Sequence, residues 1–271
     1  MDFLHYEFMQ KALFSGLLLS IITGIISFFV VNKNLSFLGV GISHIAFGGL
    51  ALGVLIGINP LFVALIFSLI ASFIIGKLNQ KERIKEDASI GILFAFSMAL
   101  GIVFIYLKEG YSTDLFSFLF GSILTITNLN IIILFVILFL ILFFMFFYFK
   151  EFIIMIFDPD YGRIMGIKIT LFYYILLGLI TISIIGTIKI VGTILISGLL
   201  VIPGVTGYMI AKDYKSHLLY SILFSFIDIF IGLILSFYLD LPSGATIVIS
   251  GIIILSLIFI LKKIIRFFIY K

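Results

Sequence analysis

The chain has 271 residues, of which 63% are hydrophobic and only 11% are charged. That composition leaves too little polar surface to cover a water-soluble globule of this size, so the sequence predicts an all-α polytopic membrane protein. The net charge of +4 does not indicate nucleic-acid binding, because Lys and Arg lie mostly in short loops, where they specify orientation in the membrane. Cysteine is absent, so any metal site must use nitrogen and oxygen ligands.

Nine apolar segments approach the ~20 residues needed to cross a hydrocarbon core of about 30 Å. Together they predict one transmembrane domain over residues 1–271. Acidic residues precede the first segment and no small-residue cleavage site follows it, so we expect the first helix to be retained rather than removed as a signal peptide. The segments are residues 12–31, 35–57, 60–76, 88–107, 129–149, 169–187, 190–211, 218–239 and 244–261.

Basic residues predict the orientation of these spans. Lys33, a Lys/Arg cluster at 77–85, the loop at 150–168 and the basic tail all fall on one side under nine spans, and that side should be cytoplasmic. The N-terminus is then outside and the C-terminus inside. Residues 114–127 are too few to cross the bilayer and too apolar for an open loop, which predicts a re-entrant or surface helix on the outer side.

His44 is a titratable residue inside the second span. It lies about 11 residues beyond Lys33, which places it roughly 16 Å deep at 1.5 Å per residue. Two interpretations stay open: a neutral imidazole bonded to a neighbouring helix, or a metal ligand or proton carrier on a transport path. Gly41 and Gly48 share its helix face and predict room for an ion or water beside the ring. Gly49, Gly53 and Gly57 instead form a small-residue stripe for close helix packing.

Asp228 is the only acidic residue well inside a predicted span, and its expected depth equals that of His44. A carboxylate there costs about 2.5 to 3.5 kcal/mol unless it is neutralised or paired. Either Asp228 is protonated and bonds a backbone carbonyl, or it shares a cation with His44. One nitrogen and one oxygen donor suit Zn²⁺, Mn²⁺ or Fe²⁺ better than Ca²⁺ or Mg²⁺.

The loop between the fifth and sixth spans contains "DPDYGRIMG". Asp158 as N-cap, Pro159 at the first helical position and Gly166 as a stop predict a short helix near 158–166, suited to docking a partner. The chain contains no phosphate-binding loop motif, so any ATP-driven transport requires an ATPase on another polypeptide. His5 and His217 lie at segment ends among ordinary polar neighbours, and we expect both at the membrane interface. No arrangement of side chains indicates an enzyme.

Five stretches, in order across residues 33–255, resemble the membrane permeases of bacterial ABC importers for zinc, manganese and ferrous iron. They are "LSFLGVGISHIAFGGLALG", "KEDASIGILFAFSMALGIVFI", "FDPDYGRIMGI", "VGTILISGLLVIPGVTG" and "LSFYLDLPSGATIVI". The resemblance implies a homodimer of permeases, two cytoplasmic ATPases that use the ATP, and an extracytoplasmic metal-binding protein. It also implies that the 158–166 segment is the coupling helix that enters an ATPase cleft, with Asp158, Pro159, Asp160, Gly162, Arg163 and Gly166 as the coupling residues.

The sequence departs from this family beside His44. Family members often have "GDALSHA" where this chain has "GVGISHI", so the acidic position falls on Val40. Our hypothesis is that Asp228 supplies the missing carboxylate and forms a transient metal site with His44. The rival interpretation is a cavity in which His44 is accompanied by neutral oxygens such as those of Ser43 or Ser197, with Gly41 and Gly48 lining the wall.

The resulting interpretation is a metal-importing ABC permease in the cytoplasmic membrane without a permanently bound cofactor. Imidazole places zinc slightly ahead of manganese or iron as the cargo. Two alternatives stay open. One is a permease for a metal chelate such as a siderophore or corrinoid. The other is an ATP-independent secondary transporter, which usually shows an internal repeat or paired broken helices; Pro203 and Gly204 interrupt the seventh span, but no convincing repeat is present.

Overall fold

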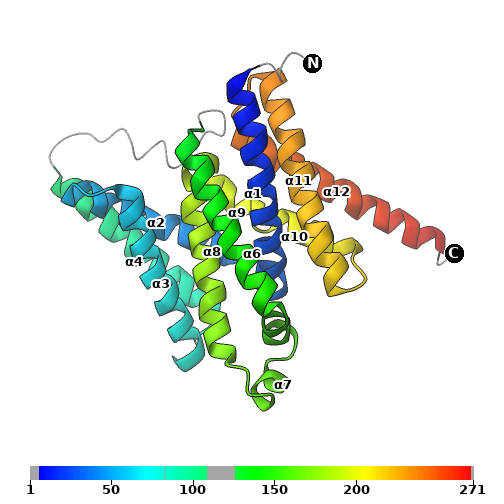
Figure 1. Ribbon diagram of the computed structural model, residues 1–271, viewed down its shortest axis with the longest axis horizontal. Helices are drawn as coiled ribbons and strands as arrows, with labels where there is room; N and C mark the ends of the chain where they lie inside the picture. The colour runs from blue at the N-terminus through cyan, green and yellow to red at the C-terminus, as the bar shows by residue number, and fades with distance from the viewer. Residues whose placement is uncertain (1–5, 83, 109–125, 270–271) are drawn as a thin grey trace.

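The computed structural model describes residues 6–82, 84–108 and 126–269 (Figure 1). Within these ranges the chain forms eleven α-helices and no strand. Eight of the helices are long and apolar enough to cross a membrane, and a shorter apolar stretch covers Leu195–Ile210. The prediction of an all-α protein with about nine membrane helices is therefore confirmed. The helices are α1 (Glu7–Asn32), α2 (Ser36–Ile56), α3 (Pro60–Glu82), α4 (Glu86–Leu107), α6 (Asn128–Phe157), α7 (Pro159–Ile164), α8 (Ile169–Val191), α9 (Thr193–Leu199), α10 (Ile202–Ile210), α11 (Tyr214–Leu239) and α12 (Ser243–Ile269).

Several helices are longer than the apolar pattern predicts. α6 continues to Phe157 across a kink at Tyr148, and α12 continues to Ile269. The predicted boundary between the sixth and seventh spans, at residues 187–190, is wrong. α8 runs on to Val191, and the chain turns at Gly192, whose φ is +88°. A search for apolar segments therefore underestimates the length of helices that extend beyond the hydrocarbon core. The predicted surface helix at 114–127 lies, up to residue 125, outside the described residues.

The helices form two groups joined by α6 and α8 (Figure 1). α2 packs against α3 and α4 in one group, and α1 packs against α11 and α10 in the other, where α12 also joins α11. α1 is buried along most of its length, so the first apolar segment is part of the packed bundle. The connections from α1 to α2, from α3 to α4 and from α6 through α7 to α8 all lie at one end, which we call the α7 end.

Small residues let α2 and α3 approach closely. A Cβ atom added to Gly49 would lie 2.6 Å from the Cα of Ala64, and one added to Gly53 would lie 2.7 Å from the Cα of Pro60. Close backbone contact of this kind drives helix association in lipid, where apolar side chains gain little by leaving the solvent. The close packing predicted for the glycine stripe is confirmed at Gly49 and Gly53. It is not found at Gly57, where an added Cβ would meet nothing within 4 Å and which instead ends α2 at a φ of +74°.

A broken span, α9 followed by α10, lies between the two groups. The helix is interrupted at Val201, whose φ and ψ are −122° and −49°, and Pro203 is the second residue of α10. On one side α9 faces α2, where a Cβ atom added to Gly39 would lie 3.5 Å from the Cα of Ser197. On the other side a Cβ on Gly198 would meet Val248 of α12 at 3.1 Å. The predicted interruption is confirmed, and it separates α2 from α12.

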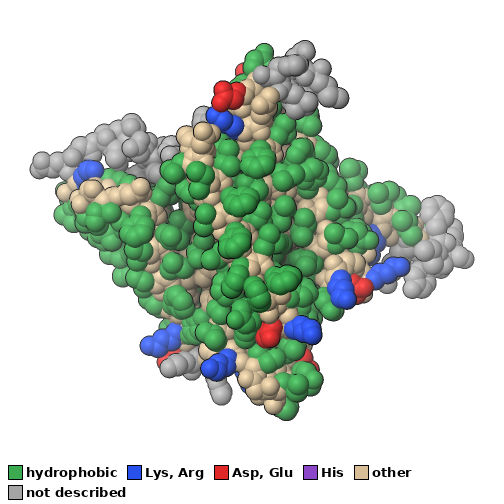
Figure 2. All heavy atoms as spheres, viewed as in Figure 1, with side chains coloured by type: hydrophobic (Ala, Val, Ile, Leu, Met, Phe, Trp, Pro, Cys, Tyr) green, Lys and Arg blue, Asp and Glu red, His purple; other side chains and the backbone are tan. Residues whose placement is uncertain are grey.

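The outer surface matches a lipid environment. Figure 2 shows apolar side chains covering the middle of the visible face, with Lys, Arg, Asp and Glu gathered toward the helix ends. Large apolar side chains on α6 are more than half exposed, among them Phe139 and Phe146. Since apolar exposure on this scale is unfavourable in water, these side chains are suited to contact with acyl chains.

Candidate functional site

His44 is half-buried on α2, against α4. Its ring meets Phe94 edge-on, with 5.1 Å between the ring centroids. Among the described residues no side chain or carbonyl forms a hydrogen bond with the imidazole, so the first interpretation, a ring bonded to a neighbouring helix, finds no partner in this structure. Both ring nitrogens therefore lack a protein partner in the described part of the chain. An imidazole in that condition can bind a metal or a water molecule.

Gly41 and Gly48 do not leave open space beside that ring. A Cβ on Gly41 would come within 2.1 Å of an Ile90 methyl group, and one on Gly48 within 2.6 Å of the Ser97 carbonyl oxygen. The expectation of room for an ion at these two positions is thus not met, because α4 occupies it. Ser43 is also fully buried and donates its hydroxyl hydrogen bond to the Val40 carbonyl at 2.8 Å.

A cavity of about 680 Å³ lies one helical turn from His44 toward the α7 end, on the side of Val40. Val40 lines it from α2 and Ser197 from α9. Residues four apart on a helix share a face, so Val40 and His44 look toward the same side of α2. Of the four residues predicted to line a cavity, Ser197 does so, whereas Gly41, Ser43 and Gly48 are packed away from it.

Asp228 is buried on α11, where only 1% of its surface is exposed. Its Oδ1 atom has no hydrogen-bond partner among the described residues. A Cβ on Gly251 of α12 would lie 2.9 Å from the other carboxylate oxygen, so that glycine makes room for the acid. The carbonyl acceptor predicted for a protonated Asp228 is not found in the described part of the chain. A buried, unpartnered carboxyl group in a membrane helix is a candidate functional group.

Asp228 and His44 lie on helices with different principal neighbours. α2 packs on α3, α4, α8 and α9, whereas α11 packs on α1, α10 and α12. The broken span lies between them, since Ile202 of α10 also approaches Gly251 beside Asp228. Within the described residues no group of three or more His, Asp or Glu side chains is arranged to hold a metal.

His217 lies in the first turn of α11 and is buried, with 3% of its surface exposed. Asn32 donates from Nδ2 to the His217 Nδ1 atom at 3.0 Å and to the Phe28 carbonyl at 2.7 Å. Since Nδ1 accepts, the ring hydrogen is on Nε2, which donates to the Gly204 carbonyl at 2.9 Å. The sequence did not reveal this burial, because a position near a segment end gives no sign that α1 and α10 cover the ring. His5 lies outside the described residues.

The polar groups around His217 continue along the contact between α1 and α11. Ser27 accepts a hydrogen bond from the backbone nitrogen of Gly204 at 2.7 Å, and Thr23 and Ser225 share one at 2.7 Å. We call the set Thr23, Ser27, Asn32, His217 and Ser225 the polar seam. Each side chain in it has at least one hydrogen-bond partner, so the seam holds helices together. Asn32 and His217 also line a cavity of about 440 Å³ at the α7 end.

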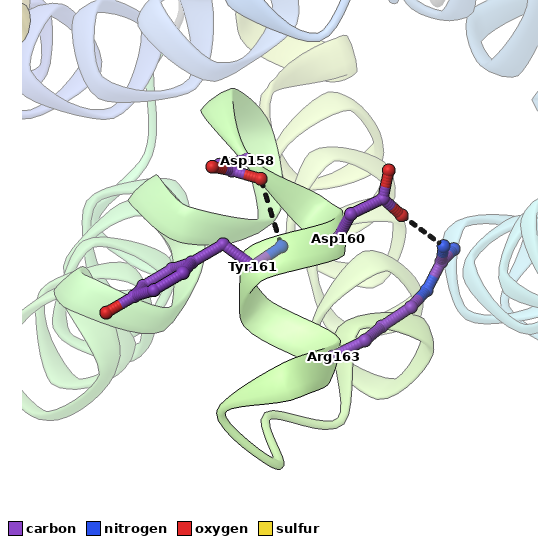
Figure 3. A network of polar contacts seen from close by, with 4 residues as sticks. All are labelled: Asp158, Asp160, Tyr161 and Arg163. Carbon is purple, nitrogen blue, oxygen red and sulfur yellow. Dashed lines mark hydrogen bonds and ion pairs between the residues drawn. The ribbon is translucent and has the colours of Figure 1, made fainter.

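α7 is the short helix predicted near 158–166, and Figure 3 shows its polar contacts. Asp158 caps it by accepting a hydrogen bond from the Tyr161 backbone nitrogen at 3.0 Å. The Asp160 carboxylate and Arg163 guanidinium form an exposed ion pair at 2.7 Å. Gly166 has a φ of +77°, the left-handed conformation in which glycine commonly follows a helix. The predicted short helix is confirmed.

The surface of α7 combines firm anchoring with apolar exposure. Gly162 is buried against Ile154 and Ile169, where an added Cβ would come within 2.9 Å and 2.5 Å of their methyl groups. Ile164 and Met165 nevertheless have 84% and 62% of their surfaces exposed. An apolar tip fixed on a capped helix is typical of a docking element.

A hydrogen bond that the sequence did not predict connects α8 to α4. The hydroxyl of Tyr173, a buried residue near the start of α8, donates to Glu86 Oε1 at 2.9 Å. α8 follows directly on α7, and Glu86 begins α4 beside the cavity. The bond therefore joins the helix that follows α7 to the helix that packs on His44.

The fold is that of a polytopic membrane permease, and comparisons with known proteins agree with it. Residues 5–264 match the ABC 3 transport family. The "Manganese transport system membrane protein MntC" of Listeria monocytogenes is 32% identical over 257 residues, which cover 95% of this chain and 91% of that protein. The "Probable iron transport system membrane protein" of Haemophilus influenzae is 35% identical over 246 residues, with 90% of each chain covered.

A solved structure extends the comparison to three dimensions. The chain is similar to one in "PsaBC from Streptococcus pneumoniae in complex with Fab", with a TM-score of 0.83, 30% identity, and coverage of 95% of this chain and 93% of that one. The chain therefore belongs to the ABC 3 transport family, and it is an integral-membrane permease of an ABC metal importer. The resemblance drawn from the five sequence stretches is confirmed.

Proposed function

We propose that this permease carries Mn²⁺ into the cell, with Fe²⁺ as an alternative cargo, and that separate ATPase subunits supply the energy. It works as a pair of permease copies with two ATPases on the cytoplasmic face and a metal-binding protein on the outer face. The α7 end faces the cytoplasm, as the basic residues of its loops predict.

The observation that supports ATP-driven transport most directly is α7. Its apolar tip, Ile164 and Met165, projects from the bundle while Gly162 locks its base between α6 and α8. A soluble partner that covers this tip can therefore push on both spans without deforming α7. Asp158, Pro159 and Gly166 fix the start and end of the helix, and Asp160 with Arg163 provides the polar rim.

The available donors favour manganese over zinc. Sequence alone placed zinc slightly ahead because of imidazole, yet among the described residues His44 is the one histidine with no hydrogen-bond partner on its ring. The other proposed donors, such as the Asp228 carboxylate, are oxygens, and such ligands suit Mn²⁺. Relatives named for manganese and for iron agree with a divalent ion that accepts mixed nitrogen and oxygen ligands.

His44 and Asp228 remain the proposed transient ligands, on opposite sides of the broken span. Because α9 and α10 separate them, one ion can contact both only after this span moves, and its non-helical break at Val201 provides the point of bending. Sequential contact, first with one residue and then with the other, also suits a transported ion, which must leave each ligand readily.

The test is ATP-driven uptake in proteoliposomes that contain the permease assembled with its ATPase. Radioactive Mn²⁺ should accumulate only when ATP is present on the side of α7, and unlabelled Fe²⁺ should compete better than Zn²⁺. Ile164→Glu should abolish ATPase binding while leaving the permease folded, because this side chain faces away from the bundle. Glu82→Gln, an exposed acid at the same end of the bundle but outside α7, is the control and should leave binding intact. Flux without ATP, or binding of the ATPase by the Ile164→Glu variant, would contradict the proposal.

A further inference from the structure

The cavity beside Val40 has polar groups on several walls. Asn34 lines it at the turn before α2, Ser36 at the first residue of α2, Asp87 at the start of α4, and Ser197 near the end of α9. These segments come from three separate parts of the sequence and meet only in the folded bundle. The cavity therefore opens where the α1 to α2 and α3 to α4 connections lie, at the α7 end, and reaches inward to the break in the seventh span.

Asp87 is the one carboxylate on the wall of this cavity within the described residues. Its side chain is exposed, and no hydrogen bond or ion pair engages it in the described part of the chain. Its neighbour Glu86 is instead occupied by Tyr173. Two adjacent acids at the start of one helix thus have different surroundings, since one is bonded to protein and the other faces the cavity.

We propose that Asp87 is an exit ligand, which receives the divalent cation after it leaves His44 and releases it to the cytoplasm. The inference rests on the proposed function, and it adds a ligand on the His44 side of the broken span. The Asp87 carboxylate, the Ser36 hydroxyl and the Asn34 amide oxygen are oxygen donors of the kind that Mn²⁺ and Fe²⁺ accept. Exposure of the carboxylate keeps the ion partly hydrated, so binding is weak enough for release.

The end of α9 adds a second attraction for a cation. Ser197 and Gly198, near the C-terminus of α9, line the cavity opposite Asp87. Carbonyl groups at a helix C-terminus carry partial negative charge, and half-helix ends of this kind coordinate cations in membrane transporters. The cavity thus has a carboxylate on the α4 wall and the C-terminal turn of α9 on another wall.

The competing explanation is that Asp87 only stabilises the first turn of α4. Acidic residues are favoured there because the helix N-terminus carries partial positive charge. The two explanations differ at Val40, which lines the same cavity from α2 but does not belong to α4. A carboxylate introduced at position 40 can replace an exit ligand, whereas it cannot stabilise the start of α4.

The experiment measures ATP-driven uptake of Mn²⁺ by the permease–ATPase complex in proteoliposomes, with ATP hydrolysis followed in parallel. Asp87→Asn should lower the initial uptake rate about tenfold, as loss of a metal-contacting group commonly does, while ATP hydrolysis continues. Asp87→Glu should retain uptake. Adding Val40→Asp to the Asp87→Asn variant should restore a substantial part of it. Val40→Asp alone should not raise uptake above that of the unmodified protein, which separates replacement of Asp87 from a new ligand beside His44. Glu82→Gln, an exposed acid at the end of α3 that does not line the cavity, is the control and should behave as the unmodified protein does.

Each outcome decides between the explanations. Normal uptake by Asp87→Asn overturns the inference, and so does a loss that Val40→Asp fails to restore, because the second result assigns the effect to α4 stability. If the unmodified complex takes up no Mn²⁺ or Fe²⁺ at all, the proposed function fails instead. The Glu82→Gln control shows whether removing any surface charge at the α7 end lowers uptake, and so separates such a general effect from loss of the Asp87 ligand.

Discussion

His44 and His217 are both at least half-buried in membrane helices, yet their surroundings differ. His217 has both ring nitrogens engaged, by Asn32 and by the Gly204 carbonyl, and it packs against Phe28 and Tyr208. The His44 ring has only the edge-on contact with Phe94 in the described part of the chain. Burial alone therefore does not identify a functional histidine in a membrane protein. The number of satisfied ring nitrogens distinguishes the two.

The two groups of helices repeat this contrast on a larger scale. Between α1, α10 and α11 the members of the polar seam bond one another or nearby backbone groups, and only its Asn32 and His217 end borders a cavity. Between α2, α4 and α9 a cavity stays open, with a carboxylate on its wall. Satisfied polar groups in lipid stabilise a fixed arrangement, whereas unsatisfied ones beside a cavity are available to a ligand. We therefore expect substitutions in the seam to change stability and substitutions near the cavity to change transport.

The largest effect should come from His44→Leu. Loss of the imidazole removes a proposed ligand, and we expect uptake to fall by about 10- to 100-fold. The melting temperature of the purified protein in detergent should change little, because the ring makes no hydrogen bond among the described residues and leucine fills similar space. Phe94→Leu is the control, since it removes the ring contact but retains His44, and its uptake should persist. Full uptake by the His44→Leu protein would exclude a role in transport.

His217→Leu should produce the opposite result. It leaves the Gly204 carbonyl without its donor inside the bundle, which costs about 1 to 3 kcal/mol for an unsatisfied buried group. We expect a lower melting temperature and unchanged uptake per folded molecule. His217→Gln, whose amide can still donate to Gly204, should lose less stability. If His217→Leu instead abolished uptake without loss of stability, the distinction between the two histidines would be wrong.

Tyr173→Phe tests the connection between the α7 end and the cavity. Removing the hydroxyl breaks its bond to Glu86, at a cost of about 1.5 kcal/mol for a hydrogen bond to a charged group. If the bond transmits movement of α8 to α4, uptake per ATP hydrolysed should fall while ATP hydrolysis continues. Tyr174→Phe is the matched control, because the neighbouring hydroxyl has no hydrogen-bond partner among the described residues. Equal coupling ratios for both variants would show that Tyr173 only stabilises the bundle.

Sequence reasoning located most spans, the short α7 helix and the interruption near Pro203, because each depends on local properties: apolar length, capping residues and proline geometry. It did not predict how the helices pack around one another. In lipid both the buried and the exposed faces are apolar, so periodicity cannot assign neighbours. Asp228 was paired with His44 on depth alone, and the cavity lined by Asp87 needs three distant segments to meet.

The same limit explains His217. Its burial depends on Asn32 and Gly204, which are 185 and 13 residues away in the chain. One signal was available: an asparagine at the end of the first span, whose amide requires partners in a membrane. A search for buried polar side chains that could satisfy one another would have suggested the seam, although it could not have chosen among the several Ser and Thr residues of these helices.

The smallest effect should be found within the seam, at Thr23 and Ser225. Thr23 already donates to the Leu19 carbonyl, so Ser225 is the donor in the 2.7 Å hydrogen bond between them. A double-mutant cycle with Thr23→Val and Ser225→Ala should give a coupling free energy of about 0.6 kcal/mol, the average for hydrogen bonds between membrane helices. The measurement is the free energy of unfolding in detergent for the two single variants and the double variant.

Pairing Thr23→Val with Ser256→Ala is the control, because Ser256 bonds within its own helix and the effects of the two changes on the free energy of unfolding should be additive. A coupling much larger than this, accompanied by loss of uptake, would show that the seam takes part in transport and that the contrast between the two groups of helices is incomplete.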